Sequence, residues 1–163
     1  MELVGVRVEM PANQPIVLLK EREGTRYLPI WIGAVEATAI AFALQGVETP
    51  RPMTHDLFVD VLAGLGATLT GVHVTALREG TFLAELHLTS GSGMIVVSAR
   101  PSDAIALASR MDDVPILAAP EVLDEAGLEI EDRDDHEEGV DAEEEVRQFR
   151  EFLDEVTPED FRG

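Results

Sequence analysis

Acidic residues are concentrated at the C-terminal end of this chain, and that asymmetry limits where a folded domain can lie. Residues 1–120 carry 13 acidic and 8 basic side chains, whereas residues 121–163 carry 19 and 4, so the second segment holds −15 of the net charge of −20. A strongly acidic stretch with few apolar residues cannot bury a core. We therefore expect one globular domain over residues 1–128, an acidic disordered linker over 129–145 and an amphipathic helix over 146–163, where apolar residues recur at helical spacing.

Short apolar segments separated by turn residues fill the first 128 residues. Period-two alternation and Gly- or Pro-rich turns predict strands, whereas runs of Ala and Leu that begin after Ser, Thr or Pro and end at Gly predict helices. The expected strands are 2–10, 16–20, 26–32, 67–77, 81–89, 94–99 and 114–118, and the expected helices are 34–44, 54–65, 102–111 and 120–126. This order predicts an α+β fold with a mixed, largely antiparallel β-sheet, helices packed against it, and an acidic C-terminal extension.

Several classes of protein are excluded by what the sequence lacks. The chain has no cysteine, which excludes disulfides, zinc-thiolate sites, iron–sulfur clusters and a cysteine nucleophile. No run of 18 apolar residues occurs, and the first residues lack the basic and apolar regions of an export signal. We therefore expect a cytoplasmic protein with no membrane partner. The net charge of −20 repels nucleic acid at long range, which counts against a nucleic-acid substrate.

Two Arg-Pro pairs stand where predicted helices begin. Arg51 precedes Pro52 and Thr54, and Arg100 precedes Pro101 and Ser102. A helix start has free N–H groups and the positive end of the helix dipole, so an adjacent arginine makes it a suitable phosphate site. The alternative is that these residues are ordinary helix caps and that each arginine pairs with a nearby carboxylate.

His55 and Asp56 follow the first Arg-Pro pair. Histidine exchanges protons near neutral pH, and both residue types bind divalent metals. The alternative is that Asp56 caps the helix and His55 is a surface or packing residue. Glu36 lies in an otherwise apolar helix, so its carboxylate must reach solvent, pair with an arginine or serve a site. His73 and His87 alternate with apolar residues in predicted strands, which favours a solvent-facing position for both.

Four sequence segments together resemble one known family. The segments LPIWIG (28–33, followed by Glu36), RPMTHDL (51–57), GTFLAEL (80–86) and RPSDAIALA (100–108) occur in the order found in the bifunctional nuclease domain family, and the resemblance covers about residues 1–128. It implies an α+β fold with a mixed sheet, a homo-oligomer, with a dimer favoured, and degradation of both DNA and RNA as substrates.

The resemblance also implies a shared functional surface, to which we assign roles as a hypothesis. Phosphodiester hydrolysis needs an activated water and positive charge opposite the developing phosphorane. The catalytic candidates are His55, as general base or acid, with Asp56, Asp103 and Glu36; the phosphate-binding candidates are Arg51, Thr54, Arg100 and Ser102. Asp56 and Asp103 are the candidate ligands of a divalent metal, Mg²⁺ or Mn²⁺. The competing hypothesis is a non-catalytic regulatory module that binds an anion or an acidic partner.

Overall fold

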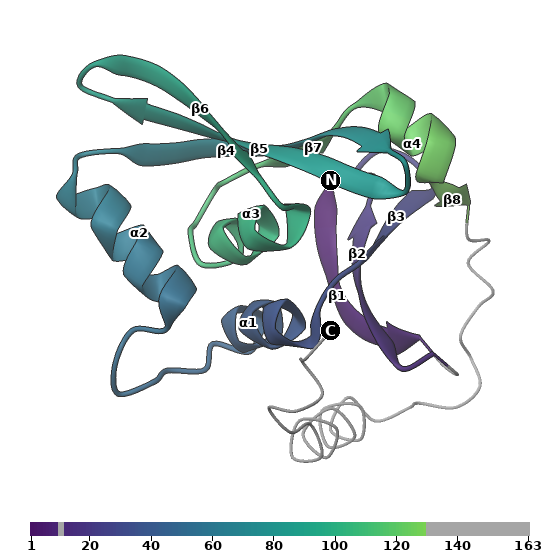
Figure 1. The fold of residues 1–163 in the computed structure, drawn as a ribbon, viewed down its shortest axis with the longest axis horizontal. Coiled ribbons are helices and arrows are strands. Elements are labelled where there is room, and N and C mark those ends of the chain that lie inside the picture. The colour runs from purple at the N-terminus through teal and green to yellow at the C-terminus, as the bar shows by residue number, and fades with distance from the viewer. Residues whose placement is uncertain (10–11, 130–163) are drawn as a thin grey trace. The chain divides into compact units, whose positions relative to one another are not determined.

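The computed structural model describes residues 1–9 and 12–129, which belong to one compact unit, Met1–Ile130 (Figure 1). The predicted helix over 146–163, and all of the predicted linker except Glu129, lie outside the described residues. Within the described ranges, no helix is both long enough and apolar enough to cross a membrane.

The described chain forms an α+β fold with two four-stranded sheets, which confirms the predicted fold class. The helices are α1 (Ala34–Leu44), α2 (Thr54–Gly64), α3 (Pro101–Ala108) and α4 (Pro120–Ala126). The strands are β1 (Glu2–Glu9), β2 (Gln14–Lys20), β3 (Arg26–Trp31), β4 (Thr68–Arg78), β5 (Thr81–Ser90), β6 (Gly93–Ala99), β7 (Ile116–Ala118) and β8 (Leu128–Glu129).

The strands divide between two sheets, where the sequence had suggested a single one. The first sheet has the order β1-β2-β3-β8 and is wholly antiparallel. The second has the order β6-β5-β4-β7, and its β4–β7 pair is parallel, so this sheet is mixed. Helices α1 and α2 separate β3 from β4 along the chain, and β8 follows β7 and α4 but pairs with β3 of the first sheet. Glu129, expected in the linker, pairs with Arg26 in β8.

The β4–β5 hairpin is fixed by its two-residue turn. Arg78 pairs with Thr81, and the two residues between them, Glu79 and Gly80, have φ values of 50° and 77°. Positive φ at both central positions is the geometry whose twist matches that of two antiparallel strands, and glycine adopts it without steric cost. Beyond a register shift between Ala76 and Val74, the pairing of the two strands places Val72, Val74 and Leu86 in the core.

Helix α3 is the central buried helix of the unit. Seven of its eight residues are buried, and it packs against β4 and β5 as well as against α1 and α2. In Figure 1, α1 lies below α3, α2 lies to its left, and β4 and β5 lie above it. Because α3 contacts α1 and α2, the first turns of these three helices can contribute side chains to one region.

Candidate functional site

The first turns of α2 and α3 meet through His55 and Asp103. His55 is the second residue of α2, Asp103 is the third residue of α3, and Nε2 of His55 lies 3.5 Å from Oδ1 of Asp103. Pro101 occupies the first turn of α3, where its missing N–H costs nothing and its fixed φ favours helix formation. The first turns of α2 and α3, each of which follows an Arg-Pro pair, are therefore in contact through these two side chains.

Arg100 links this pair to α1. Its Nε and Nη2 donate to Oδ2 and Oδ1 of Asp103 at 2.8 Å and 3.0 Å, and its Nη1 lies 2.9 Å from Oε1 of Glu36. The Arg100 side chain is nevertheless 65% exposed. Glu36, Arg100, Asp103 and His55 thus form a continuous chain of ionisable side chains from α1, α2 and the start of α3, which we call the Glu36–His55 chain.

The charges within this chain stabilise one another. Burial raises the pKa of the Asp103 carboxyl, but hydrogen bonds from Arg100 and the interaction with His55 outweigh burial and hold that pKa below its usual value. The same hydrogen bonds to Asp103, with Glu36 as a further contributor, raise the pKa of the Arg100 guanidinium. Arg100 is therefore not an unpaired phosphate-binding residue, because two carboxylates already accept its hydrogen bonds.

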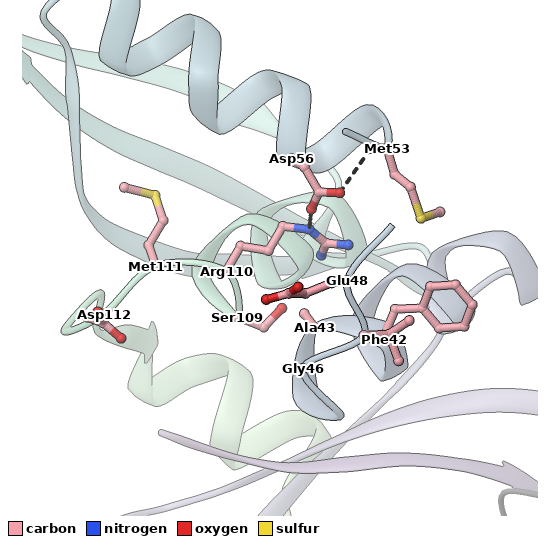
Figure 2. Close-up of a pocket in the computed structure, with 11 residues that line it drawn as sticks. Phe42, Ala43, Gly46, Glu48, Met53, Asp56, Ser109, Arg110, Met111 and Asp112 are labelled. Atoms are coloured by element: carbon pink, nitrogen blue, oxygen red, sulfur yellow. Dashed lines mark hydrogen bonds and ion pairs between the residues drawn. The ribbon is translucent and has the colours of Figure 1, made fainter. Parts of the chain in front are cut away.

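Asp56, next to His55, binds the opposite end of α3. Its Oδ2 accepts a 2.9 Å hydrogen bond from the backbone N–H of Met53, and its Oδ1 accepts one from Nε of Arg110 (Figure 2). The Arg110 side chain is only 9% exposed, and its Nη1 donates to the carbonyl of Ala106 at 2.8 Å. These hydrogen bonds, with that from Arg110 as the largest cause, lower the pKa of Asp56 below its usual value. Asp56 therefore caps α2 and ties it to α3.

A pocket of about 350 Å³ opens beside the Asp56–Arg110 pair. Figure 2 shows the two side chains facing each other at its wall, with Glu48 and Ser109 below them. The full lining is Phe42, Ala43, Gly46, Val47, Glu48, Met53, Asp56, Ser109, Arg110, Met111 and Asp112. Three carboxylates and one arginine line this pocket, so its charge suits an anion poorly.

Three of the phosphate-binding candidates belong neither to the Glu36–His55 chain nor to the Asp56–Arg110 pair. Arg51 and Thr54 are exposed, and within the described residues the Arg51 side chain makes no hydrogen bond or ion pair. Ser102 is buried in the first turn of α3. The structure therefore brings together Glu36, His55, Arg100 and Asp103, and it directs Asp56 toward Arg110.

The expected metal ligands do not form a coordination set in residues 1–9 and 12–129. No group of three or more histidine, aspartate or glutamate side chains there is arranged to hold a metal ion. Asp56 and Asp103 each accept hydrogen bonds from a different arginine instead.

Comparison with known proteins identifies the family. The family model described as the bifunctional nuclease domain matches residues 17–131, which is more than half of the chain. The chain belongs to the bifunctional nuclease domain family. Two uncharacterized proteins from two strains of Mycobacterium tuberculosis are each 52% identical to it over 162 residues, which is 99% of this chain and 96% of theirs.

One residue of this bifunctional nuclease domain that sequence reasoning missed is Arg110. A basic residue directly after an apolar helix is a recognisable signal, because cations are favoured where helix carbonyls end. Arg110 follows α3 in that way and binds the Ala106 carbonyl. Its partner Asp56 is 54 residues away, however, and nothing in the local sequence indicates that pairing.

The two strand histidines of the domain form a stacked pair. The rings of His73 and His87 lie 3.8 Å apart at an angle of 10°, and Nε2 of His87 lies 3.3 Å from Oε2 of Glu85. They occupy the sheet face opposite to the core residues Val72 and Val74, as the alternation predicted, but both are partly buried. Burial, followed by the neighbouring His87, lowers the pKa of His73.

Proposed function

We propose that this protein is a sequence-tolerant nuclease that hydrolyses phosphodiester bonds in DNA and RNA, with its reaction centre at the Glu36–His55 chain. Membership of the bifunctional nuclease domain family supports the reaction class. The single observation that supports the location is the meeting of His55 and Asp103, because it joins a proton-exchanging group to a carboxylate at two facing helix starts.

His55 acts as the general base in this proposal. Asp103 accepts a hydrogen bond from Nε2 of the imidazole, which leaves Nδ1 to take a proton from the attacking water. The Asp103 carboxylate also stabilises the imidazolium that forms. The separation of 3.5 Å is long for a hydrogen bond, as is common in catalytic pairs before the substrate binds.

Arg100 binds the phosphate by exchanging partners. Its guanidinium is held by Asp103 and Glu36, but its side chain is largely exposed, so an incoming phosphate can reach it. A phosphate that replaces the Glu36 carboxylate would keep the charge of Arg100 balanced while placing it opposite the developing negative charge. Glu36 therefore holds Arg100 in place between turnovers.

From the sequence and from family membership, we further propose that the nuclease is cytoplasmic and works as a homo-oligomer, with a dimer favoured. A divalent metal, Mg²⁺ or Mn²⁺, stays a prediction, and the roles of His55, Asp103 and Arg100 do not depend on it.

A second candidate function is a non-catalytic regulatory module that binds anions or an acidic partner. The observation in its favour is that every hydrogen-bonding contact of the Arg100 side chain in the described residues goes to a carboxylate. A carboxylate from an acidic partner could take the place of Glu36 in the same way that a phosphate could. This module would bind ligand without turnover, and binding would raise its melting temperature.

The two functions are separated by a cleavage assay. Labelled single-stranded DNA and RNA are incubated with the wild type, Arg100→Ala and a control, Arg78→Ala, each purified identically and tested with Mg²⁺, Mn²⁺ or EDTA. Arg78 is an exposed arginine in the β4–β5 hairpin. We expect the wild type and the control to cut both substrates and Arg100→Ala to be slower by about 100-fold or more. Equal cleavage by the wild type and Arg100→Ala would contradict the placement of the reaction centre at Arg100, and binding without cleavage would favour the regulatory module.

A further inference from the structure

Trp31, the single tryptophan of the chain, is an exposed aromatic residue at the end of β3. It is 52% exposed, although a tryptophan ring usually buries most of its surface in a core or an interface. Its Nε1 donates a 2.8 Å hydrogen bond to Oε2 of Glu9 in β1. The N–H bond lies in the plane of the indole, so this contact holds the ring by its edge. Among the described residues, no other ring and no cation contacts its flat faces.

Strand β3 leads directly into α1 (Figure 1), which brings Trp31 near the Glu36–His55 chain. Gly33 is the N-cap of α1 with extended backbone, and the Glu36 carboxylate lies so close to it that a Cβ there would have no room. Exposure alternates over this stretch, with Trp31 and Gly33 exposed and Ile32 half-buried between them. Positions two residues apart in an extended chain share one side and lie about 7 Å apart. Trp31 therefore lies on the side of the backbone from which Glu36 reaches Arg100.

The same face of the first sheet carries a cation that is separate from the Glu36–His55 chain. Ile16 pairs with Trp31 on one side and with Arg7 on the other, so the three residues form one row and project to one face. The buried residues Val17 and Ile30 belong to the opposite face. Arg7 is exposed, about 10 Å from Trp31 across two strand spacings, and its side chain makes no hydrogen bond or ion pair with the described residues. An aromatic face beside a positive charge is the combination with which proteins bind single-stranded nucleic acid.

We propose that Trp31 stacks against a base of a single-stranded substrate, next to the phosphate at Arg100, and that Arg7 binds a neighbouring phosphate. This inference rests on the proposed nuclease function and adds single-stranded DNA or RNA as the preferred substrate, because the bases of a duplex are stacked on each other. Every base has a π face, so stacking suits a sequence-tolerant enzyme. Stacking is also an uncharged contact, so it holds a substrate whose phosphates the net charge of −20 repels.

Tryptophan fluorescence tests the stacking directly, because Trp31 is the only tryptophan in the full chain. The probes are a short thymidine oligonucleotide and an abasic oligonucleotide with the same phosphates, both with phosphorothioate linkages that resist cleavage. We expect the thymidine strand to quench the emission and to bind about tenfold more tightly than the abasic strand. Equal affinity and equal quenching by the two strands would overturn the proposal.

Substitutions of Trp31 give a second, kinetic readout. Trp31→Ala should raise KM for single-stranded DNA by about tenfold and leave kcat unchanged, since stacking contributes equally to binding of the substrate and of the transition state. Trp31→Phe keeps an aromatic face and should recover most of the loss. Met94→Ala, which shortens a 73% exposed side chain in β6, should keep the wild-type KM. A wild-type KM in Trp31→Ala, or an equal loss in Trp31→Ala and Trp31→Phe, would count against stacking.

Arg7→Ala tests the neighbouring phosphate contact. Loss of one phosphate contact should weaken binding of the thymidine and abasic strands alike, and it should reduce the slope of log affinity against log salt concentration by about 0.7. Arg78→Ala, at an exposed arginine of the β4–β5 hairpin, should keep the wild-type slope. A wild-type slope in Arg7→Ala would remove Arg7 from the binding site.

The titration separates this inference from the proposed function. A protein that cuts single-stranded DNA but binds thymidine and abasic strands alike would overturn the role of Trp31 and leave the nuclease proposal standing. A protein that cuts nothing, but whose emission is quenched by the thymidine strand and not by the abasic strand, would support the stacking and overturn the nuclease proposal.

Discussion

Nε2 of His55 lies 3.5 Å from Oδ1 of Asp103, so a contact between these two side chains joins the first turns of α2 and α3. The neighbouring residue, Asp56, binds Arg110 just beyond the other end of α3. Two adjacent residues of α2 therefore contact residues at or just beyond the two ends of α3. The position of His55 depends on how the two helices pack. This arrangement places a titratable side chain on a rigid support.

The first prediction concerns proton transfer by His55. His55→Gln should lower kcat by about 100-fold or more, because a glutamine cannot accept the proton of the attacking water. His87→Gln, which changes the same residue type outside the site, should keep the wild-type kcat. A His55→Gln variant whose kcat matches that of the wild type would contradict the role.

The second prediction concerns the Asp56–Arg110 pair. Arg110→Ala removes the hydrogen bond to Asp56 and the one to Ala106 from a nearly buried position, so it should lower the free energy of unfolding by about 1–3 kcal/mol. Urea denaturation at neutral pH measures this loss. The exposed Arg78→Ala should change the free energy of unfolding by no more than about 0.5 kcal/mol. Similar values for the two variants would show that Arg110 does not stabilise the fold.

The third prediction is an acid dependence that comes from Asp56. Hydrogen bonding to Arg110 lowers its pKa in the folded state, so its stabilising contribution is complete above the unfolded pKa of about 4 and is lost as the pH falls through the lower folded value. Asp56→Asn should be less stable than the wild type at pH 7, and the difference should shrink toward pH 2. Denaturation curves at both pH values test this, and a difference that does not depend on pH would contradict it.

The fourth prediction concerns the histidine pair on the second sheet. Burial and His87 lower the pKa of folded His73, so the unfolded chain binds more protons below about pH 6.5 and stability should fall as the pH drops through that range. His73→Phe keeps an aromatic ring against His87 but cannot be protonated, so its melting temperature should depend less on pH between 7 and 5. A wild type and a variant with parallel profiles would rule out His73 as the source.

Local sequence signals predicted the helix starts well. Pro101 and the Arg-Pro spacing located α3, and the Asp56 cap located α2. The sequence also allowed purely structural roles for Arg100 and Asp56, and the structure shows both of them. Arg100 pairs with the nearby carboxylate of Asp103, and Asp56 caps its helix. Those interactions are determined within three residues, a range over which helix geometry is known in advance.

Contacts between distant segments could not be predicted in the same way. The pairing of Arg110 with Asp56 and the meeting of His55 with Asp103 depend on how α2 packs against α3, which no local pattern encodes. Glu36 was expected to reach solvent, pair with an arginine or serve a site, and only the fold shows that its partner is Arg100. The division into two sheets depended likewise on long-range pairing.

The central claim is that His55 and Asp103 act as one unit, and a double-mutant cycle on kcat/KM for cleavage of single-stranded DNA tests it most directly. Residues of one catalytic unit are not additive, so His55→Gln and Asp103→Asn should each cause a large loss, and the double variant should be little worse than His55→Gln alone. Losses that multiply in the double variant, or single variants that cut as fast as the wild type, would contradict the claim.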